Sequence, residues 1–334
     1  MEYQYLYDLN DQKNWINPKL IRRPDGTISE DIHIISFSQG KDSLYRVTDS
    51  TLFPVAPGTE EIQRHHSHHG GFEFFYWLTG SQHWCVNNKV AYCDAGKFTI
   101  VHPYDRHGGI FHEPSRKIGF FHNMPLSQDD SDAGVLLDQY RPGAKKSPDF
   151  PSINDNEYHS GPPLSDNFGA EPPTEIEEVP WEEMPNIRHI SKPLAEFKFD
   201  GVTMKMLSSR WENWGVVEIW GAEMEKGFCA EWNKYPIRHE MYFIPKGKVK
   251  FKVYDEEFIA YDECIVKIPK YAEHSIEVLE DTVMYDVGGQ TFWFEYLMDL
   301  FSIKKNDPAR YNDPAAMAAL KRRHGCEIKS IGRK

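Results

Sequence analysis

Histidines gather in one short segment of this chain, and a single glutamate follows them. Residues 65–80 read HHSHHGGFEFFYWLTG, and His66 and His68 share one side of an extended chain because side chains alternate along a strand. Glu73 follows within an apolar strand, where a buried carboxylate is costly unless a positive charge meets it. His107 comes after further strand-like segments. Three imidazole nitrogens and one carboxylate oxygen from neighbouring strands predict a divalent metal site with open coordination positions.

The spacing of these residues recurs in the second half of the chain. Three pairs share an offset of 167 residues: Glu73 and Glu240, Gly80 and Gly247, His107 and His274. This constant offset predicts an internal duplication. A polar surface turn is the alternative interpretation of the histidines taken alone, and the repeated spacing favours the metal site over it.

The second copy keeps only part of the predicted ligand set. The same offset carries His66 and His68 onto Asn233 and Tyr235, which leaves one nitrogen and one oxygen ligand. Such a pair would hold a divalent ion poorly. We therefore expect a metal-free structural half, with a reassembled site that uses Tyr235 or Glu231 as the alternative.

Short runs of aromatic and β-branched residues recur along both halves and are typical of antiparallel strands. They are FEFFYWL, KFTIV, KIGFFH, VVEIW, EMYFIP, KVKFKVY, CIVKI and TVMYDV. Helical signals concentrate in the C-terminal tail, where Asp313 is the expected N-cap, Pro314 the first helical residue and Gly325 the stop. Prolines and acids dominate residues 141–190, which indicates a long connector. The pattern predicts an all-β sandwich or barrel.

Composition and charge exclude several classes of partner. The 334-residue chain is 40% hydrophobic and 14% aromatic, as expected for a globular protein with a sizeable core. Its net charge of −13 argues against nucleic acid and anionic membrane, which both require an electropositive face. No apolar run reaches the ~18 residues of a membrane span, and the N-terminus shows no signal-peptide pattern. Five scattered cysteines without a CxxC motif fit a reducing compartment, so we expect a cytoplasmic protein.

The histidine segment resembles the first motif of the cupin superfamily. That motif is H-x-H, four residues, E, six residues and G, and it fits residues 66–80. GKFTIVHPYDRH is similar to the second motif, in which His107 is the fourth ligand. This second motif departs from the family pattern, since the proline is displaced to Pro103 while Tyr104 and Phe111 replace a glycine and an asparagine. The resemblance covers both halves and implies a bicupin.

The resemblance implies two tandem cupin barrels, also described as double-stranded β-helices or jelly rolls. We expect an N-terminal metal-binding domain, a Pro-rich connector, a C-terminal domain with a degenerate site and a helical tail, over residues 1–140, 141–190, 191–300 and 301–334. The expected cofactor is a divalent metal, with Mn(II) preferred and Fe(II) or Zn(II) as alternatives. The resemblance also implies a homodimer acting on a small-molecule substrate.

Residues beside the expected ligands are the candidates for catalysis. His102, Tyr104 and Arg106 precede His107 and are the expected acid, base or substrate anchor. Nine of the fifteen histidines lie between residues 65 and 122, which favours proton-transfer chemistry near neutral pH.

We therefore expect redox-neutral chemistry on a small, enolisable, oxygenated substrate. Hydrolytic ring opening of a cyclic 1,3-diketone is the most specific form of this hypothesis, as in dihydrophloroglucinol cyclohydrolases among cupin-like proteins. A dioxygenase that uses Fe or Mn, resembling quercetinases or diketone-cleaving enzymes, and a sugar ketol-isomerase are the alternatives. A non-catalytic binding cupin is a third, and the four-ligand set counts against it.

Overall fold

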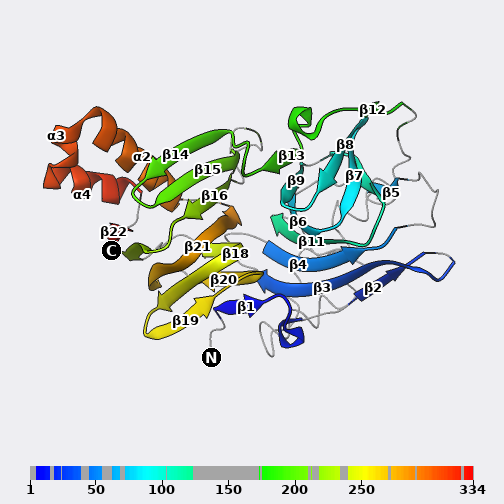
Figure 1. Cartoon of the computed structure of the whole chain (residues 1–334), viewed down its shortest axis with the longest axis horizontal. Helices are drawn as coiled ribbons and strands as arrows, with labels where there is room; N and C mark the ends of the chain where they lie inside the picture. The colour runs from blue at the N-terminus through cyan, green and yellow to red at the C-terminus, as the bar shows by residue number, and fades with distance from the viewer. Residues whose placement is uncertain are drawn as a thin grey trace, which may run out of the picture. The chain divides into compact units, whose positions relative to one another are not determined.

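The structure is a computed structural model of the chain. It describes residues 5–15, 19–23, 25–38, 45–54, 62–67, 72–102, 104–122, 173, 175–209, 212, 218–233, 240–269, 272–289, 292–324 and 327–333. The described residues are mostly in β-strands, and the α-helices lie near the C-terminus (Figure 1). The all-β prediction is therefore confirmed. The chain divides into two compact units. The first unit is Lys13–His189, and the second unit combines Met1–Gln12 with Ile190–Lys334.

The unit Lys13–His189 is a sandwich of two sheets around one apolar core. The seven-stranded sheet has the order β13 (Ile187–His189), β9 (Lys97–Val101), β6 (Phe72–Thr79), β11 (Ser115–His122), β4 (Tyr45–Leu52), β3 (Ile28–Ser38) and β2 (Lys19–Arg22). The five-stranded sheet has the order β12 (Glu177–Glu178), β8 (Lys89–Asp94), β7 (Ser81–Val86), β10 (His107–Phe111) and β5 (Gln63–His66). Phe75 and Trp77 of one sheet and Trp84 and Val86 of the other share the core. Alternation along β6 therefore turns Glu73 toward the same interior as Phe75.

The end of the predicted connector belongs to this first unit. β12 pairs with β8, and β13 pairs with β9. A single 3-10 turn, Trp181–Glu183, lies between them. The predicted connector boundary at residue 190 coincides with the division between the units, but the last part of the connector completes both sheets of the first one.

The second unit is built on one ten-stranded sheet. Its main order is β1 (Leu6–Asp8), β20 (Cys264–Ile268), β18 (Glu240–Val253), β21 (Glu273–Gly289), β16 (Glu218–Met224), β15 (Val202–Ser208) and β14 (Ala195–Phe199). β17 (Phe228–Asn233) pairs with β21 and β22 (Glu327–Arg333), and β19 (Glu256–Ala260) pairs with β18. The prediction assigned residues 1–140 to the N-terminal domain, whereas β1 pairs with β20 of the second unit.

The two units repeat each other in backbone detail. Gly80 and Gly247 both have positive φ, 86° and 116°, and a Cβ on either would lie 2.7 Å or 2.6 Å from the Cα of Ser115 or Thr282. Ser115 and Thr282 are themselves 167 residues apart. The Ser115 and Thr282 hydroxyls donate to the carbonyls of matching residues, Ser81 and Glu113 in the first unit and Lys248 and Glu280 in the second. The predicted duplication is confirmed.

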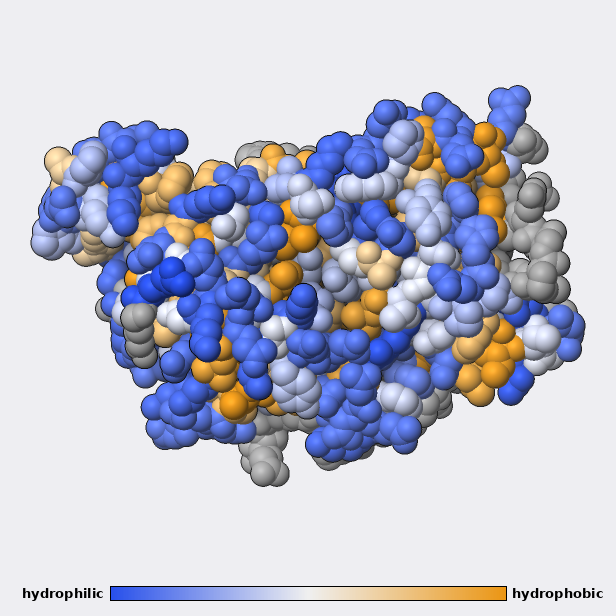
Figure 2. All heavy atoms as spheres, in the orientation of Figure 1, coloured by the Kyte–Doolittle hydropathy of each residue, from blue (hydrophilic) through white to orange (hydrophobic). Residues whose placement is uncertain are grey.

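The helices are α2 (Phe292–Asn306), α3 (Pro308–Tyr311) and α4 (Pro314–Arg323). Asp313 caps α4 as predicted, because its carboxylate accepts a hydrogen bond of 2.9 Å from the backbone N–H of Ala315. Gly325, the predicted stop, lies outside the described residues. None of the helices in the described ranges is long and apolar enough to cross a bilayer. Figure 2 shows a largely hydrophilic face with scattered hydrophobic groups.

Candidate metal centre

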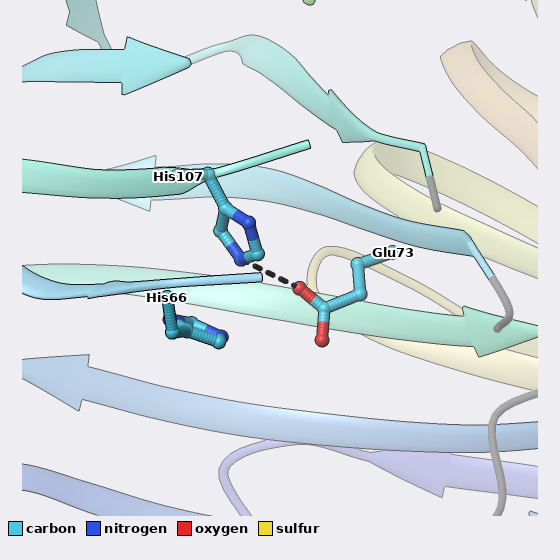
Figure 3. A group of neighbouring side chains, drawn as sticks. All are labelled: His66, Glu73 and His107. Carbon is cyan, nitrogen blue, oxygen red and sulfur yellow. Dashed lines mark ion pairs between the residues drawn. The ribbon is translucent and has the colours of Figure 1, made fainter. Parts of the chain in front are cut away.

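Three of the four predicted ligands meet inside the first unit. His66 comes from β5, His107 from the adjacent β10 and Glu73 from β6 of the facing sheet. Their ligand atoms all lie within 4.8 Å of one another, and the side chains converge in Figure 3. His68, the fourth predicted ligand, lies outside the described residues.

Strand register explains how these side chains converge. His66 and His107 are direct partners in the β5–β10 pair, and their ring centroids are 4.1 Å apart. Glu73 pairs with Val101, which belongs to the apolar interior. Only 5% of Glu73 and 1% of His107 is exposed to solvent. A carboxylate at this depth needs a positive partner.

The orientation of His107 suits a metal ligand. Its Nδ1 lies 3.0 Å from the carbonyl oxygen of Asp105, and a carbonyl only accepts, so Nδ1 carries the hydrogen. On a neutral ring, the Nε2 lone pair then points toward Glu73 Oε2, 3.3 Å away. Two electron-rich atoms this close require a cation or a proton between them. The donor set of imidazole nitrogens and a carboxylate oxygen therefore fits a divalent transition ion.

Asp105 organises the loop that leads to His107. Its carboxylate accepts hydrogen bonds from His102 Nδ1 and the His102 backbone N–H, both at 3.1 Å. The side-chain amides of Asn87, at 3.0 Å, and Asn186, at 3.1 Å, complete the set. Burial raises the pKa of Asp105, but the hydrogen bonds from His102 and Asn87 outweigh it and leave this pKa below its usual range. The charged carboxylate thus holds the loop whose carbonyl orients His107.

The structure places the predicted catalytic residues on this loop. His102 binds Asp105 and packs edge-on against Phe72, with ring centroids 5.9 Å apart. Tyr104 is 62% exposed and has a φ of 69°. Arg106 is exposed, and its backbone N–H donates to the side-chain oxygen of Asn87. Their predicted roles toward a substrate stay predictions.

The interior beside His107 is aromatic rather than rich in histidine. The indole of Trp84 lies 5.8 Å from the His107 ring, centroid to centroid, and Trp84 packs against Phe75 and Trp77. His83, next to Trp84 in β7, is on the opposite face of the strand by alternation. The number of histidines in this part of the sequence therefore overstates how many line the site.

The sequence analysis missed Asp105 and Asn186, the two residues that position the loop between β9 and β10. We call this loop, which leads to His107, the metal loop. Asp105 precedes His107 by two residues, so its place in the second cupin-like motif was an available signal. Asn186 carried no such signal, because it lies in the acidic segment assigned to the connector, 81 residues from Asp105.

The second unit contains the corresponding pair in a different setting. His274 Nε2 lies 3.4 Å from Glu240 Oε2, and His274 Nδ1 lies 3.0 Å from the carbonyl oxygen of Ala272. Tyr242, at the position of Phe75, donates its hydroxyl to the same Glu240 oxygen. Among the described residues, the group able to hold a metal lies in the first unit.

The residues proposed for a reassembled second site receive no support from the described part of the chain. Glu231 is exposed on β17 and forms an ion pair of 3.5 Å with Lys329. Tyr235 lies outside the described residues, and the side chain of Asn233 is not among those described.

Comparison of the fold with solved structures agrees with the two-barrel architecture. No family model and no curated protein matches the sequence. A Bacillus subtilis oxalate decarboxylase characterised for its Mn(II) centres is similar over 100% of this chain and 90% of its own, with a TM-score of 0.52 and 13% identity. A formate complex of Lactobacillus farciminis oxalate decarboxylase is similar over 86% of each chain, with a TM-score of 0.51 and 12% identity.

These neighbours are bicupins, and the chain has the bicupin fold. The particular form found here combines a His–Glu–His group in one barrel with a Glu–His–Tyr group in the other.

Proposed function

We propose that this chain is a metal-dependent cupin enzyme that cleaves a carbon–carbon bond of a small, oxygen-rich substrate without net oxidation. The observation that carries the proposal is the convergence of His66, Glu73 and His107 inside the first barrel, with Glu73 and His107 buried. His68 is the proposed fourth ligand, because it is the second histidine of the H-x-H motif. Mixed nitrogen and oxygen donors suit Mn(II), Fe(II) or Zn(II), and Mn(II) is our preferred ion.

A bound divalent ion would supply Lewis-acid polarisation of substrate oxygens and a readily deprotonated water. The protein side chains supply orientation and proton handling. Asp105 fixes the proton of His107 on Nδ1, which keeps Nε2 available as a ligand. Trp84 and its aromatic neighbours exclude water from one side of the imidazole. Tyr104 and Arg106 are exposed beside His107, and we propose that they bind substrate oxygen atoms.

Two substrate classes are compatible with this chemistry. Our first candidate is a cyclic 1,3-diketone that is opened by hydrolysis, because a divalent ion would act as a Lewis acid toward its oxygens and would favour its enolisation. The second is a small dicarboxylate that is decarboxylated, and the oxalate decarboxylases with the same fold favour it. A ketol isomerisation would also need no oxidant and belongs in the same assay series.

A dioxygenase is the alternative reaction class. The aromatic residues beside His107 favour it, since they provide the dry surroundings that oxygen chemistry prefers. The redox-neutral proposal is therefore tested directly against it.

The test is metal analysis of the purified protein followed by a substrate screen under strict anaerobiosis. We expect bound Mn(II) and turnover without oxygen, and we expect Glu73→Gln to lose both. Glu240→Gln, the matched change in the second barrel, controls for altered charge in a buried site. Turnover that requires oxygen would reject the redox-neutral mechanism. Metal content unchanged in Glu73→Gln would reject the site itself.

A further inference from the structure

A second group of histidines lies on the outer face of the five-stranded sheet. Alternation along β7 turns Trp84 into the core and His83 to the outside. His83 pairs directly with Ile110 of β10. His112 follows Ile110 by two residues, so it belongs to the same outer face and lies diagonally across from His83.

The two imidazoles are in direct contact. His83 Nδ1 lies 2.6 Å from His112 Nε2, and the rings meet edge to face with centroids 4.9 Å apart. On the far side of the His83 ring, Nε2 lies 3.9 Å from a carboxylate oxygen of Glu178 in β12. The three side chains therefore form a short chain of nitrogen, nitrogen and oxygen donors at the surface.

We propose that His83 and His112 bind a transition ion of the Ni(II), Cu(II) or Zn(II) class at this outer face, with Glu178 accepting a hydrogen bond from the remaining His83 nitrogen. Bonds of about 2.1 Å to one ion place two imidazole nitrogens roughly 3–3.5 Å apart. The two rings reach that spacing by a small rotation, which their position at the surface permits. A carboxylate on the second ring nitrogen orients a ligating histidine and strengthens it as a donor.

The charge state of the pair suits this role. Burial and the neighbouring His112 lower the pKa of His83, and Glu178 raises it in part. Two nitrogen ligands favour ions that prefer imidazole over the oxygen-seeking Mg(II) and Mn(II).

Binding at this site would connect three strands. The ion would join β7 to the residue that follows β10, and Glu178 would extend the connection to β12, which lies within the predicted connector. The outer site would therefore stabilise the attachment of β12 to the rest of the first barrel.

Titration of metal-free protein with Ni(II) by calorimetry tests the proposal. We expect two equivalents bound by the unmodified chain, one by His83→Gln or His112→Gln, one by Glu73→Gln and none by Glu73→Gln combined with His83→Gln. Glu178→Gln should keep the second equivalent and weaken it about tenfold. Because each site is removed separately, failure of the interior site and failure of the outer site give different stoichiometries.

His33→Gln is the matched control. The His33 Nε2 lies 3.1 Å from an Asp31 carboxylate oxygen, and the His33 ring stacks on Trp15. The substitution therefore removes a histidine beside an acid and leaves His83 and His112 unchanged. It should bind as much Ni(II) as the unmodified chain. The proposal is overturned if His83→Gln and His112→Gln both retain the full Ni(II) stoichiometry, or if their losses equal that of His33→Gln.

Discussion

Tyr104 has a backbone conformation that glycine adopts freely and tyrosine rarely does. Its φ of 69° places it in a turn in which the Asp105 N–H donates to the carbonyl of His102. That turn positions the Asp105 carboxylate and so the orientation of His107. A bulky, exposed side chain kept in a strained position next to a metal site suggests a role that only the ring can perform.

Tyr104→Gly should therefore separate stability from activity. The left-handed conformation costs about 1–2 kcal/mol for tyrosine, and glycine removes this cost. Glycine also loses more conformational entropy on folding, which lowers the gain in stability by about 0.5–1 kcal/mol. We expect an unfolding free energy equal to the original or up to about 1.5 kcal/mol higher, with lower turnover. Thermal unfolding and steady-state kinetics measure the two effects.

Tyr254→Gly is the matched control for this substitution. Tyr254 has a φ of 53°, is exposed like Tyr104 and occupies the position of Asn87 in the second barrel. It should give the same stability change with no change in turnover. Equal turnover in both glycine variants would show that the Tyr104 side chain has no role in catalysis.

At the scale of elements, the segment before β13 braces the metal loop. The Asn186 amide donates to the carbonyl of Ile100 at 2.8 Å and to Asp105 at 3.1 Å, and the Asn186 carbonyl accepts from the Ile100 N–H. Asn186 is also buried. The loop that presents His107 is therefore supported by a residue that follows Asp105 by 81 residues in sequence.

Asn186→Ala should weaken both the fold and the metal site. The buried groups left behind cost about 1–3 kcal/mol, and loss of such supporting contacts typically lowers metal affinity about 10–100-fold. Unfolding curves and a metal-binding titration measure these losses. Asn306→Ala removes an exposed amide that binds Ser302, and it should change neither quantity. An unaltered metal affinity in Asn186→Ala would show that the metal loop keeps its conformation without the hydrogen bonds from Asn186.

The turn between β6 and β7 allows a second test at this scale. Gly80→Ala adds a methyl 2.7 Å from the Ser115 Cα at a φ of 86°, so it combines a clash with backbone strain. We expect a loss of about 2–5 kcal/mol in unfolding free energy, and a similar loss for Gly247→Ala. Gly227→Ala has the same φ of 86° but nothing within 4 Å of its Cβ, so it should lose only the strain component. Equal losses at Gly80 and Gly227 would contradict the predicted clash.

Local patterns in the sequence predicted the strands and most of the ligands because both depend on spacing along one chain segment. Alternation along FEFFYWL set the face of Glu73, and the repeated interval located His107 and its second copy. Contacts between distant segments left no such pattern. Asn186 joins Asp105 across 81 residues, and β1 joins β20 near the far end of the chain. Such contacts depend on tertiary packing, which periodicity and motif spacing do not encode.

At the scale of the whole molecule, the two barrels share one backbone fold and differ in the side chains that contact the buried glutamate. Glu73 faces two imidazoles, whereas Glu240 faces His274 and the hydroxyl of Tyr242. The exchange of Phe75 for Tyr242 supplies a proton donor beside the carboxylate. Hydrogen bonds to Glu240 can then replace part of the charge compensation that an ion would provide.

Metal stoichiometry distinguishes these two settings. With Mn(II) as the probe, we expect one ion per chain, retained in Glu240→Gln and lost in Glu73→Gln. Tyr242→Phe should lower the unfolding free energy by about 1.5–3 kcal/mol, because a hydrogen bond to a charged group is removed, and should leave the Mn(II) content at one. Elemental analysis after exhaustive dialysis, combined with denaturant unfolding, gives both quantities. Two ions per chain, with one lost in Glu240→Gln, would show that the second barrel is also a metal site and that Tyr242 belongs to its surroundings instead of substituting for the ion.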